Sequence, residues 1–178
     1  SFNGVSIMTG TGYVSANFSA WGGFATTILL IVMFIGGCGG STTCGIKVFR
    51  LQVLASTAKV QISRLLRPHA VVLAYYNKRP VSVEVMDSVM GFFYLFILGF
   101  VLIAIMLGIA GLDFVTALSG AATSISNVGP GLGEVIGADG NFSTLPDSAK
   151  WIMTFAMLLG RLEIFTVLVM LNPAFWQR

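Results

Sequence analysis

Charged side chains are scarce in this chain. Only 10% of its 178 residues are charged, whereas 56% are hydrophobic, and the mean hydropathy is +0.88. A soluble globular domain carries about 25% charged residues. The composition therefore excludes an ordinary soluble domain and predicts a membrane protein in contact with lipid. We expect no nucleic-acid partner.

Metal-ligating and nucleophilic residues are also scarce. The chain has one histidine and two cysteines, Cys38 and Cys44, which flank five residues of a glycine-rich segment. Two cysteines are too few for a metal site, and no base or metal-ligand cluster accompanies them. We expect a reduced pair in a cytosol-facing environment and no enzymatic activity. A membrane-embedded enzyme that uses the cysteines remains a lesser alternative.

Glycine, in contrast, is abundant and clustered. Residues 126–133 read SNVGPGLG and follow Phe114 to Ile125, a segment that is short for a membrane span and lies between two long apolar segments. Non-helical backbone at membrane depth must face protein or a water-filled path, because lipid cannot hydrogen-bond its amides. The order of span, short helix, glycine loop and span therefore predicts a re-entrant pore loop. A plain glycine-proline turn is the alternative.

Such a loop suits a cation. A short helix directs the negative end of its dipole into the loop, and glycine lets successive carbonyls turn toward one axis, where they can replace the hydration shell of potassium. Residues 127–131 can be laid over the Thr-Val-Gly-Tyr-Gly signature of potassium channels, with Gly129 as the central glycine. Residues 6–13 read as a second copy, with Ser6 aligned to Thr123 and residues 11–13 to residues 128–130. The chain thus contains a repeat.

A helix between these loops is too short to cross a bilayer. Trp21 to Ile35 is an uncharged run of 15 residues, or about 22 Å of helix against a hydrocarbon core of roughly 30 Å. Gly36 to Gly45 follows, with five glycines in ten residues. Glycine is a poor helix former, so this pattern predicts a loop inside the membrane, beneath the filter. A glycine-rich contact between closely packed helices is the alternative.

The middle of the chain is basic. A helix is expected to resume at Ile46, to have an apolar face that includes Phe49, Val53 and Val60, and to end at Arg67-Pro68. Ala70–Tyr76 and Val81–Val85 are rich in β-forming residues and predict a small hairpin. This exposed segment would suit docking to a partner, and a plain surface turn is the alternative.

Two further spans and the charges give an orientation. Val89 to Leu112 has no charge over 24 residues, and Trp151 to Leu171 is the last apolar run. The segment between the first two spans carries seven basic residues: Lys47, Arg50, Lys59, Arg64, Arg67, Lys78 and Arg79. Glu134, Asp139 and Asp147 follow the second loop. The positive-inside rule places residues 47–79 and Arg178 in the cytoplasm, so both filters open outward.

An arginine lies near the centre of the last apolar run. Placing Arg161 at mid-membrane costs about 2.5 to 3.5 kcal/mol on insertion scales, so it should face protein or water. Glu163 is two positions away and cannot share its helix face unless Gly160 breaks the helix. We expect the guanidinium to lie beside the glycine loop, cap loop carbonyls and repel cations when the loop is closed. An arginine satisfied by neighbouring carbonyls is the structural alternative.

Together these segments resemble the membrane subunits of Trk/Ktr-type potassium transporters, within the potassium-channel-like superfamily. The specific matches are residues 127–133, residues 36–47, and Gly160 to Glu163 followed by residues 172–176. The resemblance implies an all-α membrane protein built from repeats of span, re-entrant pore loop and span, with a broken inner helix. It implies the end of a third pore unit at 1–69, a cytoplasmic linker or hairpin at 70–88 and a complete fourth unit at 89–178.

The resemblance also implies roles for individual residues. The filter carbonyls that bind potassium would belong to Thr9, Gly10, Thr11, Gly12, Tyr13, Ser126, Asn127, Val128, Gly129 and Pro130, and Gly131 ends the second loop. The gate would consist of Gly36, Gly37, Gly39, Gly40, Ser41, Thr42, Thr43, Gly45 and Arg161.

Partners and location follow from the same resemblance. It implies a homodimer in the bacterial inner membrane, a cytosolic ring of nucleotide-binding regulatory subunits and a preceding part of the same chain that carries two further filters. The expected function is gated potassium uptake, with the transported potassium ion as the one ligand. The alternatives are a secondary cation symporter that uses Arg161 and Glu163 as a midplane coupling pair, and a sodium-permeable homologue.

Overall fold

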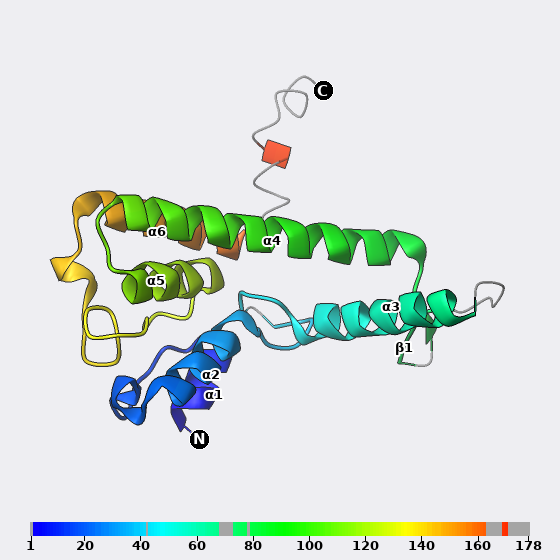
Figure 1. Ribbon diagram of the computed structural model, residues 1–178, viewed down its shortest axis with the longest axis horizontal. Coiled ribbons are helices and arrows are strands. Elements are labelled where there is room, and N and C mark those ends of the chain that lie inside the picture. The colour runs from blue at the N-terminus through cyan, green and yellow to red at the C-terminus, as the bar shows by residue number, and fades with distance from the viewer. Residues whose placement is uncertain (1, 42, 68–72, 78, 163–168, 171–178) are drawn as a thin grey trace.

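The computed structural model describes residues 2–41, 43–67, 73–77, 79–162 and 169–170, and its fold is all-α apart from one short hairpin. The described helices are α1 (Phe2–Met8), α2 (Gly23–Phe34), α3 (Val48–Leu66), α4 (Val83–Ile109), α5 (Phe114–Ser126) and α6 (Asp147–Arg161), with 3₁₀ turns at Phe18–Trp21 and Phe142–Thr144. Strand β1 (Tyr75–Tyr76) pairs antiparallel with β2 (Arg79–Pro80). Figure 1 shows α4 running along the molecule, with α5 and α6 beside one half of it and α3 beside the other.

Helix α4 is the one described helix that is long and apolar enough to cross a membrane. Its 27 residues correspond to about 40 Å at 1.5 Å per residue, which exceeds a hydrocarbon core of about 30 Å. It starts at Val83, six residues before the predicted span, with Glu84 in its first turn, where a negative charge stabilises a helix. The predicted strand Val81–Val85 is therefore wrong, and the observed strands are only two residues long.

The helices on either side of the glycine segment are shorter than predicted. Helix α2 begins at Gly23 because a separate 3₁₀ turn, capped by the Asn17 side chain, occupies Phe18–Trp21. Helix α3 begins at Val48 and not at Ile46, because Ile46 pairs with Ile35 in an isolated parallel bridge. Its start is thus set by backbone pairing with the end of α2.

The last helix also differs from its prediction. Helix α6 begins at Asp147, four residues before Trp151, and ends at Arg161 with Leu162 as its C-cap. Arg161 therefore lies at a helix end and not in the middle of a described 21-residue span. Gly160 sits in this last turn, and glycine is among the weakest helix formers. Residues 163–168 and 171–178, which include Glu163, lie outside the described residues.

The core surrounds α5. One apolar cluster joins α4, α5 and α6 through side chains such as Phe96, Ile125 and Met153. A second joins α1, α2 and the loop after α5 through Ile7, Met33 and Val128. Ten of the 13 residues of α5 are buried. The short helix that precedes the second glycine loop is thus enclosed by other elements of the chain.

Candidate functional site

The first glycine loop follows directly from α1. The Thr11 amide donates to the Ser6 carbonyl at 3.0 Å, and the Gly12 amide reaches the same oxygen at 3.3 Å. Gly10 and Gly12 have φ values of +67° and +75°, which side chains disfavour and glycine adopts freely. These bonds and dihedrals fold the backbone back over the end of α1.

The second loop has the same construction at the end of α5. The Val128 amide donates to the Thr123 carbonyl at 3.1 Å, and the Gly129 amide donates to the Thr123 hydroxyl at 3.0 Å. Asn127 is left-handed at φ +51° and Gly129 has φ +114°. Ser126 is the last residue of α5 and is buried, so among the ten predicted filter residues it belongs to the helix and not to the loop.

The backbone hydrogen bonds of the two loops repeat with the spacing that the sequence alignment gives. Thr11 to Ser6 corresponds to Val128 to Thr123, and Gly10 to Ile7 corresponds to Asn127 to Ser124. The difference lies in the following amide, which binds a backbone carbonyl in the first loop and a threonine hydroxyl in the second. The side chain of Thr123 is therefore a site residue that the filter prediction did not include.

The two loops meet. A Cβ atom at Gly12 would lie 2.5 Å from the Val128 carbonyl oxygen, and one at Gly129 would lie 3.7 Å from the Gly12 Cα. No side chain fits at Gly12 unless the second loop moves. Thr9, Thr11, Tyr13 and Gly129 are exposed, whereas Val128 is buried and the remaining loop positions are half-buried. The structure thus brings the central glycines of both loops together and leaves one side of them open.

Helix α6 fixes the end of α5. The Asn127 side-chain amide donates to the Met157 carbonyl at 3.0 Å. A Cβ atom at Gly160 would collide with the Ile125 carbonyl oxygen, so the backbones of α5 and α6 approach each other as closely as glycine allows. In the sequence, Gly160 was identified as a position that could interrupt the helix and as part of the matched segment 160–163, and no packing role was predicted for it. Its role in packing depends on the close contact between α5 and α6, which the tertiary structure shows.

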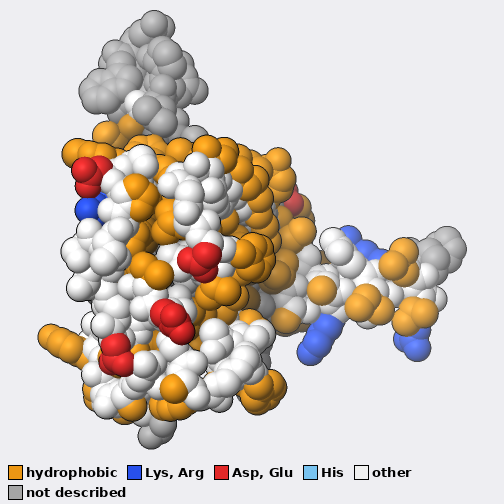
Figure 2. Space-filling view, turned by 60° about the vertical axis from the view of Figure 1, so that its left-hand side comes forward, with side chains coloured by type: hydrophobic (Ala, Val, Ile, Leu, Met, Phe, Trp, Pro, Cys, Tyr) orange, Lys and Arg blue, Asp and Glu red, His pale blue; other side chains and the backbone are white. Residues whose placement is uncertain are grey.

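Polar contacts also join the segments that follow the two loops in the chain. The Ser19 hydroxyl donates to the Gly133 carbonyl at 3.2 Å, and the Asn17 side chain donates to Asp139. Asp139 belongs to the predicted external acidic segment. In Figure 2 the acidic side chains lie mainly on the body of the molecule, whereas most basic ones lie on the segment that projects from it.

The segment between α2 and α3 is a closed loop. The Ile46 amide donates to the Phe34 carbonyl at 2.8 Å, and the Gly36 amide donates to the Ile46 carbonyl at 2.9 Å. Inside the loop, the Gly37 amide donates to the Thr43 hydroxyl at 2.8 Å. Gly45 has φ +80°. The two ends of the loop are therefore joined like a short ladder, and its tip extends from this base.

The predicted gating residues divide between the base and the tip of this loop. Gly36 and Gly45 are at the base, where a Cβ on Gly36 would collide with the Cys44 carbonyl. Gly39 and Gly40 are exposed at the tip, and Gly40 has no neighbouring atom within 4 Å of an added Cβ. Thr42 lies outside the described residues.

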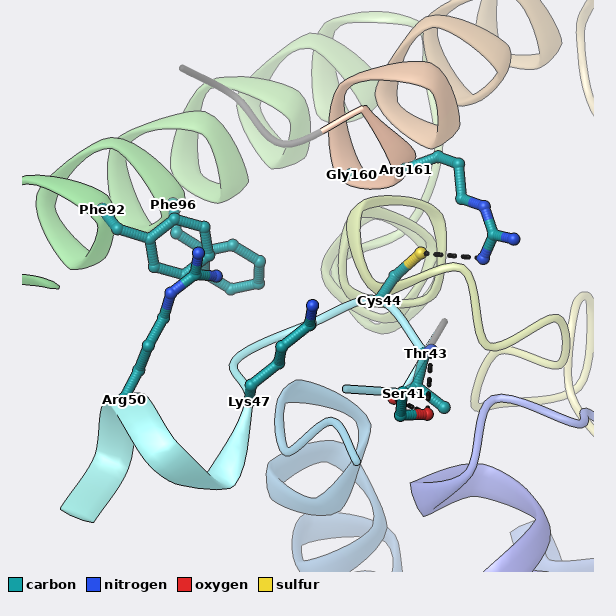
Figure 3. Close-up of a pocket in the computed structure, with 10 residues that line it drawn as sticks. Ser41, Thr43, Cys44, Lys47, Arg50, Phe92, Phe96, Gly160 and Arg161 are labelled. Atoms are coloured by element: carbon teal, nitrogen blue, oxygen red, sulfur yellow. Dashed lines mark hydrogen bonds between the residues drawn. The ribbon is translucent and has the colours of Figure 1, made fainter. Parts of the chain in front are cut away.

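Arg161 lies against this loop, as Figure 3 shows. Its Nη1 donates to the Cys44 Sγ at 3.7 Å. This contact with a thiol was not predicted, and the capping of loop carbonyls by Arg161 stays a prediction. A pocket of about 250 Å³ opens beside it, lined in part by Lys47, Arg50 and Phe92. These three residues were not predicted site residues, although two basic side chains directly after a glycine-rich loop are a signal that the sequence contains.

The cysteines carry no metal site in the part of the chain that the structure describes. Cys38 is exposed and Cys44 half-buried, and both are free thiols. Among the described residues no group of three or more histidine, cysteine or acidic side chains could hold a metal ion. Arginine contact, and not metal ligation, is the role in which Cys44 is seen.

Comparison with known proteins agrees with this architecture. The TrkH family model, described as a cation transport protein, matches residues 1–178. The chain is 48% identical over 177 residues to the Trk system potassium uptake protein TrkI of Halomonas elongata, and 37% identical over 176 residues to TrkH of Escherichia coli. Each alignment covers 99% of this chain and 36% of the relative. The chain therefore spans about a third of the length of these relatives.

A solved structure is similar as well. The potassium transporter TrkH from Vibrio parahaemolyticus superposes with a TM-score of 0.87 at 40% sequence identity, over 97% of this chain and 36% of that one. The matched proteins are membrane transporters and not enzymes, which agrees with the prediction that the chain has no enzymatic activity.

Proposed function

The chain belongs to the TrkH family of membrane proteins that transport cations, and we propose that it forms part of a gated potassium uptake pathway. The observation that carries this proposal is the contact between Gly12 and Gly129 at the centres of two loops with matching backbone hydrogen bonds. Repeated loops that converge can offer carbonyl oxygens to one dehydrated cation. The proposed filter residues are those predicted at 9–13 and 126–130, of which Ser126 is the last residue of α5.

The unequal covering of the two short helices supports further pore units. Phe2, Val5 and Met8 are 57%, 59% and 43% exposed, and all lie along α1. By the spacing of the repeat they correspond to Ser119, Ala122 and Ile125, which are 1%, 0% and 0% exposed. An apolar face that is covered in one copy and open in the other is the surface on which the two additional pore units of a fourfold arrangement would pack. The proposed units are therefore 1–69, 70–88 as linker and 89–178.

The loop at residues 36–45 and Arg161 are the proposed gate. The ladder at Phe34, Gly36 and Ile46 holds the base of the loop, and the exposed Gly39 and Gly40 leave its tip the freedom to move. Arg161 contacts the loop through Cys44, where its charge would repel a cation that leaves the filter. Lys47 and the other basic residues of 47–79, with Arg178, would face the cytoplasm of a bacterial inner membrane.

The proposed assembly is a homodimer on a cytosolic ring of nucleotide-binding regulatory subunits. The supporting feature of this chain is the projecting segment of α3 and the hairpin, with exposed Lys59, Arg67 and Arg79. A partner that docks in the cytoplasm needs such a surface outside the lipid.

The filter is tested by substituting its central glycines in the full-length protein. Gly129→Ser and Gly12→Ala each force a side chain onto a left-handed backbone, and we expect potassium over sodium selectivity to fall at least about tenfold, or about 1.4 kcal/mol. Rubidium and sodium uptake into proteoliposomes measures this ratio. Gly4→Ala, in α1 with no neighbour within 4 Å, is the control. Unchanged ion preference with lost coupling would favour the symporter that uses Arg161 and Glu163, and a wild-type pathway without potassium preference would favour the sodium-permeable alternative.

The gate is tested separately. Arg161→Ala removes the positive charge beside the loop, so we expect basal rubidium flux to rise about tenfold, as for a barrier lowered by about 1.4 kcal/mol. Lys150→Ala, a change of equal charge at the other end of α6, controls for surface charge. Unchanged or lower flux at equal expression would count against the proposed gate.

A further inference from the structure

The last residue of α2 packs against aromatic side chains of α4. The Phe34 ring meets the Phe96 ring edge to face, with the ring centroids 6.1 Å apart, and it meets the Phe100 ring in the same way at 5.0 Å. Aromatic pairs prefer this arrangement, and it stabilises them beyond the area that they bury. Because Phe96 and Phe100 are four residues apart, they lie on one face of α4. The end of α2 is therefore attached to this face of the membrane-spanning helix.

Phe34 also belongs to the base of the loop at residues 36–45. Its carbonyl accepts a hydrogen bond from the Ile46 amide at 2.8 Å, and the Ile46 side chain is buried in the same apolar cluster as Phe96. A Cβ atom at Gly45 would lie 3.0 Å from the Phe34 carbonyl oxygen, so the two ends of the loop are closely packed at this point. One residue thus carries both the backbone ladder of the loop and its aromatic contact with α4.

The aromatic contacts continue to the helix that follows the loop. The Phe96 ring stacks on the Phe92 ring with centroids 5.8 Å apart, and the Arg50 guanidinium lies 3.8 Å from the centre of the Phe92 ring. A guanidinium over a ring face is attracted by the electrons of the ring. Figure 3 shows Phe92 and Phe96 together on α4, with Arg50 reaching them from the start of α3. The helices before and after the loop therefore contact the same row of rings.

The ladder and the rings have different effects on the loop. The hydrogen bonds between Phe34, Gly36 and Ile46 join the two ends of the loop to each other, which sets the shape of its base. These bonds do not join the base to another helix. The contacts of Phe34 with the rings of α4 do so, and Phe34 packs against both apolar clusters of the chain. The place of the loop in the molecule thus depends on these side chains.

We propose that Phe34 and Phe96 are positioning residues for the loop at residues 36–45. Their contact, extended by Phe92 and Phe100, holds the base of the loop against α4 and keeps the loop in its closed position. This inference rests on the proposed gate, because it says what keeps that gate in place. The position of the loop and the flux of ions are measured separately, so each idea can fail alone.

The two cysteines of the loop report on its position. Cys38 is exposed at the tip, whereas Cys44 is half-buried at the base and contacts Arg161. Full-length protein in nanodiscs is treated with N-ethylmaleimide, and tandem mass spectrometry follows the alkylation of both thiols. The Cys38 rate serves as the internal reference. The ratio of the Cys44 rate to the Cys38 rate then measures how often the base of the loop opens.

Replacing either ring should free the base. Phe96→Leu and Phe34→Leu keep an apolar side chain but remove the edge-to-face contact, and we expect each to raise the alkylation ratio about threefold or more. Tyr94→Leu is the matched control, because this ring lies on α4 but is 67% exposed, and it should keep the wild-type ratio. An unchanged ratio in both Phe34→Leu and Phe96→Leu overturns the proposal.

Two further comparisons separate positioning from general loosening of the core. Leu107→Ala removes a fully buried side chain from the same cluster on α4 without touching the loop, so it should lower stability and leave the ratio unchanged. An equal rise in Leu107→Ala overturns the proposal. The double variant Phe34→Leu/Phe96→Leu should raise the ratio by less than the product of the single effects, because both changes remove one contact. Independent effects would overturn the direct coupling.

Rubidium flux in the same variants tests the gate. A higher alkylation ratio together with higher basal flux supports both the positioning role and the gate. A higher ratio with wild-type flux keeps the positioning role and removes the loop as the gate. If Phe96→Leu is not monodisperse, the comparison of Phe34→Leu with Tyr94→Leu decides, because Phe34 is only half-buried and tolerates the smaller side chain better.

Discussion

The two glycine loops share a backbone but differ in their surroundings. Residues 9–13 and 127–130 carry corresponding hydrogen bonds at the ends of α1 and α5. However, α5 packs against α2, α4 and α6, whereas the main helix contact of α1 among the described residues is α2. Ten of 13 residues are buried in α5, against three of seven in α1.

This difference separates the local interactions that set the conformation of each loop from the tertiary contacts that set its position. The fold of each loop is set by its own short helix, its glycines and a few backbone bonds, so it forms in both settings. The position of the loop depends on the helices that enclose it, and α6 does this for the second loop through Gly160 and Asn127. The two copies therefore allow each cause to be changed alone.

Breaking the enclosure should have the largest effect. Gly160→Ala drives a methyl group into the Ile125 carbonyl. This must move α6 away from α5 and expose the end of α5 that α6 now covers. Overpacking of this kind costs about 1–3 kcal/mol or more. We expect less monodisperse full-length protein and reduced rubidium uptake, measured by size-exclusion chromatography and flux. Gly108→Ala on α4, where no atom lies within 4 Å, should behave as wild type, and equal behaviour of both variants would refute the packing role.

Removing the hydroxyl group of Thr123, or that of Ser6 at the corresponding position, should have an intermediate effect on the free energy of unfolding. Thr123→Val removes the acceptor of the Gly129 amide and should lower the free energy of unfolding by about 0.5–1.5 kcal/mol, the net contribution of one hydrogen bond. The Ser6 hydroxyl at the corresponding position has no hydrogen-bond partner in the described structure. Ser6→Ala should thus change stability by less than about 0.5 kcal/mol. Unfolding in mixed detergent micelles measures both, and equal losses would contradict the asymmetry.

The start of each short helix gives the smallest expected difference. Asp113 caps α5 by accepting from the Thr116 amide at 3.2 Å, whereas α1 has no acidic residue in its first turn. Asp113→Ala should cost about 1 kcal/mol. Asp113→Asn should cost little, because asparagine caps as well as aspartate. The same unfolding assay checks both variants.

The cap also predicts a pH dependence. Hydrogen bonding to the Thr116 side chain lowers the pKa of Asp113 below its usual value, and bonds from nearby backbone amides act in the same direction. The carboxylate therefore adds stability above its unfolded pKa of about 3.9, and this stability is lost as the pH falls through the lower folded pKa. The acid-dependent loss should be smaller in Asp113→Asn than in wild type. Identical pH curves would remove Asp113 from this role.

Much of this fold could be predicted from the sequence, because the patterns that indicate it lie within short segments. The membrane class followed from composition, the all-α class was implied by the family resemblance, and the glycine segment after α2 was predicted from residue type and spacing. The predicted hairpin was too long. Residues 83–85 include β-forming valines, but they begin the longest helix because Ser82 is its N-cap, Glu84 lies in its first turn and an apolar run follows. The end of α6 at Arg161 was missed for a related reason, because an apolar pattern continues beyond the point where the helix stops.

By itself the sequence determined that this is a membrane chain with two copies of one glycine loop, because hydrophobicity, glycine spacing and charge placement act residue by residue. Only the tertiary structure decided that Gly12 meets Gly129, that Gly160 lets α6 touch the end of α5, and that Lys47, Arg50 and Arg161 share one pocket. These pairs lie far apart along the chain, and their contacts exist only because close packing of helices leaves no other place for their backbones and side chains.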